Sequence, residues 1–261
     1  MRLCVILLLT VSGVVAQDTA MAGRAAAVPV LVELFTSEGC SSCPPVDSWL
    51  QKMDSSQPVP GARLIVLSEH VDYWDHDGWK DPFSSPALTD RQSAYAGKLG
   101  LATVYTPQVI IDGTSELRAN DSQQVNQVFR KAVTRPMIPV RITSVSTELG
   151  GPFVAQAHVE IDGTSTQRDA DIYMALALDH AESDVLRGEN SGQRLSYVAV
   201  VQSLTKVGKL QKGKKFDQEV RMKLRPGSDP SNVRMIVFVQ DSGPGEVVGA
   251  TSEKLSDQKS H

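Results

Sequence analysis

The stretch "ELFTSEGCSSCPP", residues 33–45, passes from an apolar run into two cysteines separated by two serines. Residues 28–35, "VPVLVELF", are apolar and β-branched, which predicts a buried strand. After the cysteines, apolar residues recur at the spacing of one helical face: Val46, Trp49, Leu50 and Met53. Pro44 and Pro45 suit the first turn of that helix, where a missing N–H group costs nothing. The Cys-x-x-Cys motif therefore falls between a buried strand and the start of a helix.

The chain continues to alternate strand and helix as far as Pro136. A second buried strand is expected in "RLIVLSEHV" (63–71), and a helix in "SSPALTDRQSAYAGKLG" (84–100). "TPQVIIDGTSEL" (106–117) predicts a strand, an Asp-Gly turn and a short further strand. Asn120 or Asp121 is expected to cap a last helix. This order predicts an α/β domain over residues 28–136 with some parallel strand pairing.

Beyond Pro136 the hydrophobic period changes to two. Seven strands are expected: "IPVRITSV", "FVAQAHVEI", "ADIYMALAL", "SYVAVVQSL", "KFDQEVRMKL", "VRMIVFVQ" and "EVVGAT". They predict a separate antiparallel β-sandwich-like domain over residues 137–251. The polar end, residues 252–261, is expected to be a flexible tail.

The composition is that of a soluble globular protein, with 41% hydrophobic and 21% charged residues. A formal net charge of −4 gives no reason to expect a nucleic-acid partner. No cofactor-binding motif stands out, and we expect no cofactor.

The N-terminus has the pattern of a secretory signal peptide over residues 1–16. Arg2 precedes a continuous apolar run that ends at the small residue Ala16, and the run is shorter than the roughly 20 residues of a membrane span. We expect cleavage after Ala16, a secreted or periplasmic protein, and no stable membrane anchor afterwards. A buried N-terminal strand or an uncleaved anchor is the alternative.

Signal cleavage would remove Cys4, one of the three cysteines, and leave Cys40 and Cys43. In an oxidising compartment this isolated pair can bond only to itself. The positive end of the helix dipole favours a thiolate at Cys40, which predicts a lowered pKa and the role of nucleophile. Cys43, one helical turn in, is expected to be more buried than Cys40 and to resolve a mixed disulfide formed there.

The order strand, Cys-x-x-Cys, helix, strand, helix and "YTP" resembles the thioredoxin fold over about residues 28–135. "ELFTSEGCSSCPPVD", "SEHVDYWD", "GWKDPFSS" and "VYTPQVIIDG" are similar to an exported, mainly bacterial thioredoxin-like family of unknown function with a β-rich C-terminal domain. The resemblance implies that Thr106 and Pro107 form a cis-proline loop that faces the cysteines and binds substrate backbone. It also implies a buried acid that aids proton transfer. Glu33 is the nearest match, one residue off the spacing, and an acid at a strand edge or in a salt bridge is the alternative.

Polar and aromatic residues crowd the end of the second strand in "SEHVDYWDHDGWKDP" (68–82). Ligands in open α/β sheets gather at the carboxyl ends of strands. Glu69, His70 and Trp74 are therefore candidates for lining a cleft at the cysteines, for binding a substrate peptide or for holding a metal. The alternative is an ordinary loop with packed tryptophans and solvated acids. A polar loop, "RGENSGQR" (187–194), is a candidate partner contact or only a loop.

These features predict an exported thiol–disulfide oxidoreductase that acts through Cys40 and Cys43 on protein or small thiol substrates. The two serines between the cysteines do not set the direction of electron flow, and neither the redox partner nor the oligomeric state follows from the residues. One alternative is a non-catalytic binding module with a static disulfide. A second is a copper-handling protein that uses the same thiols with His70 or His76.

Overall fold

The computed structural model describes residues 27–76, 78–148 and 154–255. The predicted signal peptide, with Cys4, lies outside these residues, as do Asp77, Phe153 and positions 256–261 of the predicted tail. Within the described ranges, no helix is long and apolar enough to cross a membrane.

The predicted helices and strands of the first half are present. They are β1 (Val28–Thr36), α1 (Pro44–Ser56), β2 (Ala62–His70), α2 (Pro86–Leu99), β3 (Gln108–Ile111), β4 (Ser115–Leu117) and α3 (Ser122–Ala132). Their ends follow local rules. Gly100 closes α2 in the left-handed conformation, and the Asp121 side chain caps α3 by accepting two backbone N–H groups. Asp112 and Gly113 both have positive φ, as the tight turn between β3 and β4 requires.

The seven strands expected in the second half are also present. They are β5 (Val140–Glu148), β6 (Val154–Asp162), β7 (Ala170–Asp184), β8 (Arg194–Leu210), β9 (Lys215–Lys223), β10 (Val233–Asp241) and β11 (Val247–Lys254). One short 3-10 helix, η1 (Pro230–Asn232), precedes β10. Strand β6 alternates buried and half-buried residues along its length, as its sequence period predicts. Strand β11 includes Ser252–Lys254, the first residues of the predicted tail.

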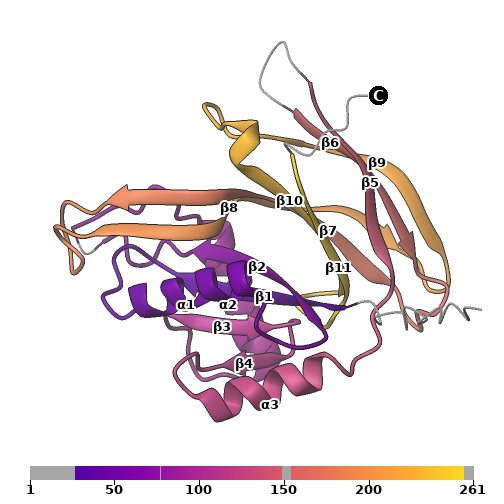
Figure 1. Cartoon of the computed structure of the whole chain (residues 1–261), viewed down its shortest axis with the longest axis horizontal. Helices are drawn as coiled ribbons and strands as arrows, with labels where there is room; N and C mark the ends of the chain where they lie inside the picture. Colours follow the sequence, from indigo (N-terminus) through magenta and orange to yellow (C-terminus); the bar gives the residue numbers. More distant parts are fainter. Residues whose placement is uncertain (1–26, 77, 149–153, 256–261) are drawn as a thin grey trace, which may run out of the picture.

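The predicted fold class, a thioredoxin-like α/β domain followed by a separate β-sandwich, is wrong. The described strands form one mixed sheet of eight strands, in the order β11-β10-β7-β8-β2-β1-β3-β4, and a second sheet, β5-β6-β9. Strands β1 and β2 are parallel, as predicted. Strand β8 lies parallel to β2 and pairs with it at Ser68 and Val200, so strands from both halves of the chain share one sheet. Figure 1 shows β7 and β8 as a long pair that extends over α1.

The edge of β2 explains this arrangement. An open sheet edge presents a row of unpaired N–H and C=O groups that can pair with a further strand. The β8 backbone and the Ser68 hydroxyl, which donates to the carbonyl of Val198 at 2.7 Å, cover the edge of β2. Strands β7 and β8 have 15 and 17 residues, so one end of the pair joins β10 while the other end reaches the helices.

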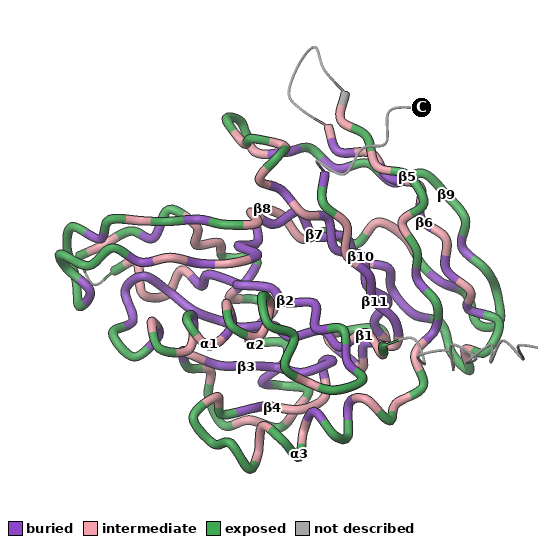
Figure 2. Tube along the Cα trace, in the orientation of Figure 1, coloured by how far each residue is buried: buried purple, intermediate pink, exposed green. Residues whose placement is uncertain are grey.

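The two largest apolar clusters of the described residues each draw on strands of the large sheet, where buried positions are purple in Figure 2. The first lies against the helices and combines β1 and β2 with buried residues of β7, β8 and β10, such as Ala175, Val201 and Phe238. The second lies between the three-stranded sheet and the outer strands β7 and β10. The division of the chain near 136–139 remains a prediction. Across it, Gln51 of α1 donates to the carbonyl of Ser196 on β8 at 2.7 Å.

Candidate functional site

Cys40 and Cys43 form a disulfide in the turn between β1 and α1. Cys43 is the N-cap of α1, and its N–H donates to the carbonyl of Cys40 at 3.2 Å. The pair is thus joined as the sequence predicts, at the positive end of a 13-residue helix. Both residues are buried, with 1% of Cys40 and 0% of Cys43 exposed. The expected difference in exposure between them is absent in this disulfide-bonded state.

A groove of about 690 Å³ lies beside the disulfide. Ser42, Pro45 and Val46 line it on the side of α1, and Tyr105 and Pro107 line the facing side. Its other lining residues are Leu101, Ala102, Thr103, Glu116, Leu117, Arg118, Ala119 and Asn120. The Cys40 Sγ lies 3.4 Å from the hydroxyl of Ser42, which is exposed. The Thr106–Pro107 bond is cis. The loop predicted to face the cysteines therefore shares a groove with the cysteine turn.

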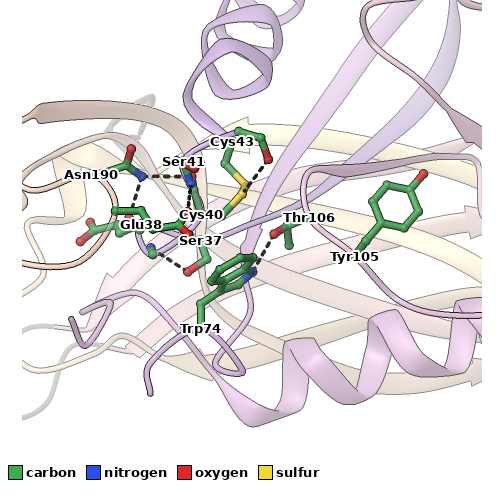
Figure 3. The surroundings of a disulfide bond; sticks show 12 residues. Ser37, Glu38, Cys40, Ser41, Cys43, Trp74, Tyr105, Thr106 and Asn190 are labelled. Carbon is green, nitrogen blue, oxygen red and sulfur yellow. Dashed lines mark hydrogen bonds between the residues drawn. A yellow bond between two sulfur atoms is a disulfide. The ribbon is translucent and has the colours of Figure 1, made fainter. Parts of the chain in front are cut away.

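Trp74 joins this loop to the cysteine turn, as Figure 3 shows. Its indole N–H donates to the hydroxyl of Thr106 at 2.8 Å. On the other side it packs so closely on Gly39 that a Cβ there would lie 2.9 Å from the Trp74 Cβ. Glycine at position 39 is therefore required by the tryptophan. Of the three candidates in 68–82, Glu69, His70 and Trp74, it is Trp74 that bonds Thr106.

A buried carboxyl lies one helical turn beyond Cys43. Asp47 donates its backbone N–H to the carbonyl of Cys43 at 3.0 Å, and the residue is only 4% exposed. Neither carboxylate oxygen has a hydrogen-bond partner of normal geometry among the described residues. Burial raises the pKa of Asp47 to about 7. Asp47 was not among the residues predicted from the sequence, although the spacing Cys43, Asp47, Leu50 places it on the buried face of α1.

His70 and Asp81 form a second buried pair near the cysteine turn. The Nδ1 of His70 lies 2.7 Å from the Asp81 carboxylate, which also accepts the N–H of Glu38 at 2.9 Å. Burial opposes the charged imidazole, but Asp81 and then Asp47 outweigh it and raise the pKa of His70. Burial likewise opposes the Asp81 carboxylate, but His70 holds the pKa of Asp81 below its ordinary value. Trp79 donates its indole N–H to the Glu38 carboxylate at 2.6 Å.

Glu33 and Glu69 belong to a different network, on the side of α2. Arg91 forms an ion pair with Glu33, and the Tyr95 hydroxyl donates to Glu33 at 2.6 Å. Glu69 is fully buried, and burial together with the neighbouring Glu33 raises its pKa well above the ordinary value. The salt bridge was one of the two expectations for Glu33. In the described part of the chain, neither glutamate is hydrogen-bonded to a cysteine.

The tip of the β7–β8 hairpin, residues 185–193, contacts the cysteine turn from about 150 positions further along the chain. The Asn190 side chain donates to the carbonyls of Glu38 at 2.8 Å and of Cys40 at 3.0 Å. The Glu189 carboxylate accepts the N–H of Ser41 at 3.0 Å. The sequence marked 187–194 as a loop or a partner contact, but no local signal linked Glu189 or Asn190 to the cysteines.

Metal binding was one expectation for the 68–82 segment. Among the residues that the structure describes, no group of three or more His, Cys, Asp or Glu side chains is placed to hold a metal ion.

The fold and the site define a mostly β protein on a mixed eight-stranded sheet, with a buried Cys-x-x-Cys disulfide at the start of a helix. The chain belongs to the family described as "Protein of unknown function (DUF1223)", whose model matches residues 31–240.

Two solved structures are similar over most of the chain. One is the X-ray crystal structure of a protein from Agrobacterium tumefaciens, with 27% identity and a TM-score of 0.68 over 90% of this chain and 98% of that one. The other is HBP35 of Porphyromonas gingivalis, with 14% identity and a TM-score of 0.61 over 89% and 76% of the two chains. The second likeness concerns the fold alone. No curated protein matches the chain.

Proposed function

We propose that this protein is a thiol–disulfide oxidoreductase that exchanges its Cys40–Cys43 disulfide with the cysteines of a protein or a small thiol. The observation that carries the proposal is the position of the disulfide at the start of α1. Ser42, the residue before Cys43, lines a groove that Pro107 also lines. The resemblance of this local arrangement to the thioredoxin-like superfamily supports it. The direction of electron flow depends on the reduction potential of the pair relative to its compartment.

In the oxidising direction, a substrate thiolate attacks Cys40 Sγ. The Cys40–Cys43 bond breaks, a mixed disulfide forms at Cys40, and Cys43 leaves as a thiolate. A second substrate thiolate then attacks the substrate sulfur of the mixed disulfide, and Cys40 leaves. The substrate dithiol becomes a disulfide, and its two electrons reside on the reduced cysteine pair. Reduction of a substrate disulfide is the same sequence in reverse.

Asp47 is the side chain best suited to exchange the proton of Cys43. Its carboxyl follows Cys43 by one helical turn, and burial raises its pKa to about 7. A group whose pKa lies near the working pH can both accept and return a proton. The absence of competing hydrogen bonds of normal geometry to its oxygens, among the described residues, leaves the carboxylate available for this role.

The groove suits an extended substrate segment. Its walls are mainly apolar, with the exposed ring of Tyr105 at one side and Ser42 next to the disulfide. Tyr105 also donates its hydroxyl to Glu116 at 2.8 Å, which fixes the ring at the groove. In this proposal Thr106 and Pro107 bind the substrate backbone while its cysteine reaches Cys40.

A binding module with a static disulfide is the second candidate. The observation in its favour is the burial of both cysteines, since a sulfur must be reached before it can exchange. The two candidates differ in whether any substrate thiol forms a covalent intermediate with the pair.

Trapping of that intermediate separates the two. Wild type is incubated with reduced, unfolded ribonuclease A and, in parallel, with reduced glutathione, while Cys40→Ser and Cys43→Ser are incubated with the disulfide forms of the same two probes, and every reaction is quenched with acid. For the oxidoreductase we expect turnover by wild type, and a mixed disulfide from the oxidised probes only on Cys43→Ser, detected by mass spectrometry. An absence of both turnover and mixed disulfides with either probe would establish the static disulfide.

The proposal includes export to a secreted or periplasmic location, since the sequence of residues 1–16 has the pattern of a signal peptide. Expression of the full chain in a bacterial host tests it. We expect the mature protein outside the cytoplasm to begin at Gln17. A cytoplasmic protein that retains Met1 would contradict export.

A further inference from the structure

The β7–β8 hairpin tip (residues 185–193) has a defined, hydrogen-bonded backbone conformation. The backbone ladder continues into it, with the N–H of Val185 donating to Gln193 at 2.9 Å and that of Gly192 donating to Val185 at 2.7 Å. Gly188 and Gly192 have φ values of 78° and 80°, which only glycine adopts readily. At the base of the tip, Val185 is buried in a small apolar cluster.

This cluster fixes the hairpin to the loop that follows β2. Ala181, Val185, Leu195 and Tyr197 pack together, and Trp79 and Phe83 from the loop pack against them. The ring of His70 contacts both Phe83 and Tyr197, with centroid distances of 5.3 and 4.7 Å. The hairpin tip therefore has a defined position beside the cysteine turn, because its base is part of a packed core.

Both the NH₂ group and the oxygen of the Asn190 side-chain amide form hydrogen bonds. Its NH₂ donates to the carbonyls of Glu38 and Cys40, and its oxygen accepts from the Gln193 side chain at 3.2 Å. The residue is 1% exposed. A buried amide whose donors bond one carbonyl in the cysteine turn and one just before it fixes the conformation of that turn. Glu189, fully exposed, adds a third link through the N–H of Ser41.

We infer that Asn190 is a positioning residue that sets the redox poise of the disulfide. A disulfide forms more favourably when its two sulfurs are already held within bonding distance, because less conformational freedom is lost on closure. The cysteine turn, Cys40–Cys43, has only four residues. Its Cys40 carbonyl and Ser41 N–H, together with the carbonyl of Glu38 just before it, are bonded to the hairpin tip. The second half of the chain thereby stabilises the oxidised pair and lowers its reduction potential.

The bonds from Asn190 lower the reduction potential whether or not the cysteine turn relaxes when the disulfide is reduced. If the turn keeps its shape, the bonds from Asn190 preserve a high effective concentration of Cys43 near Cys40. If the turn relaxes, those bonds exist only in the oxidised protein and stabilise it directly. Loss of the amide therefore makes the disulfide easier to reduce. The inference deepens the proposed function, and its role in turnover rests on that function.

The test measures the redox equilibrium of the purified full chain in a series of dithiothreitol buffers. The fraction of reduced cysteine is read by alkylation and mass. For Asn190→Ala we expect reduction at an about tenfold lower ratio of reduced to oxidised dithiothreitol, or ~30 mV. Asn190→Asp, which keeps the shape but has no donor, should shift in the same direction. For Glu189→Ala, on the surface, we expect an about twofold shift.

Asn232→Ala is the matched control. Asn232 also bonds a backbone segment through both groups of its amide, but its partners are the N–H and carbonyl of His180 on β7, at 3.0 and 2.8 Å, and not groups of the cysteine turn. We expect its redox midpoint to equal that of wild type. If Asn190→Ala is folded by circular dichroism and keeps the wild-type midpoint, the inference is overturned. If it does not fold, a wild-type midpoint in Glu189→Ala overturns it.

Equal shifts in Asn190→Ala and Asn232→Ala would also overturn the inference, because the effect would then be one of general stability. This readout is independent of turnover. A shifted midpoint in a protein that forms no mixed disulfide with either substrate probe would leave the inference standing and contradict the proposed function. Turnover by wild type, together with an unshifted midpoint in Asn190→Ala, would support the proposed function and overturn the inference.

Discussion

The indole N–H of Trp74 donates to the hydroxyl of Thr106 at 2.8 Å, across 32 positions of sequence. This bond joins the loop after β2 to the loop that precedes Pro107. Since Trp74 also packs on Gly39, it holds the two sides of the site at a fixed separation.

Trp74→Phe keeps an aromatic ring but removes this donor. If Thr106 binds substrate backbone, the loss should raise KM for a cysteine-containing peptide by about three- to tenfold, the effect of one hydrogen bond. The free energy of unfolding should fall by only about 1 kcal/mol. Trp49→Phe, in the core-facing side of α1, serves as the control and should change stability without changing KM. An unchanged KM in Trp74→Phe would refute the positioning role.

Asp47→Asn should make the protein more stable at high pH but slow its thiol–disulfide exchange. The ordinary pKa is 3.8, and the folded value is raised by burial to about 7. Between these values the unfolded chain loses the proton while the folded protein keeps it, so the free energy of unfolding falls as pH rises from 4 to 7. At pH 7 and above, this loss in the free energy of unfolding reaches about 4 kcal/mol. The variant should lose this dependence, be more stable at pH 8, and exchange thiols at pH 7 about tenfold to a hundredfold more slowly.

Asp112→Asn is the matched control for that prediction. Burial raises the pKa of Asp112 to about 7 as well, but its carboxylate accepts the N–H of Leu31, at the end of β1 away from the cysteines. We expect urea unfolding as a function of pH to show the same flattening in both variants, with slower exchange only in Asp47→Asn. Normal exchange in Asp47→Asn would show that another group takes the proton.

Glu33→Gln tests the residue that was the nearest sequence match for an acid that aids proton transfer. Glu33 holds Arg91 and Tyr95, and Arg91 is 9% exposed at its side chain. The change leaves the buried guanidinium without its main partner and should cost about 3–5 kcal/mol of stability. The pH profile of exchange should stay that of wild type. Exchange at pH 7 that is slowed as in Asp47→Asn would instead assign the proton relay to Glu33.

Gly113→Ala tests the packing between the two halves of the chain. An added Cβ would overlap the carbonyl oxygen of Gly245, in the loop before β11, and φ is 66°. Gly243 has a similar φ of 69° with nothing within 4 Å of the added Cβ. We expect Gly243→Ala to cost about 1 kcal/mol, from φ alone, and Gly113→Ala about 3 kcal/mol or more. Equal losses in urea unfolding would contradict a tight contact between the β3–β4 turn and this loop.

Several parts of the site were predictable because they depend on short-range interactions. The buried strand β1, the prolines at the start of α1, and the glycine and aspartate caps follow from periodicity and from backbone groups within a few residues. The bond between Cys40 and Cys43 follows from their isolation and spacing. Asp47 was within reach of the same reasoning, since its position on the helix places it on the buried face.

The arrangement of the strands was not predictable in this way. Every strand of the second half was recognised, yet the two predicted domains share a sheet through Ser68 and Val200. Alternation shows that a strand has a buried face, but not which edge it pairs with. That choice depends on which edges the rest of the fold leaves open.

The sequence by itself determined the helices and strands, the Cys-x-x-Cys turn and its closed disulfide, because each depends on neighbours a few positions apart. Only the tertiary structure decided that Asn190 bonds the carbonyl of Cys40, that Trp74 meets Thr106, and that Glu33 pairs with Arg91. These contacts join segments 32 to 150 positions apart. The pattern of residues along a chain specifies local conformation, whereas such contacts depend on the packing of the whole sheet.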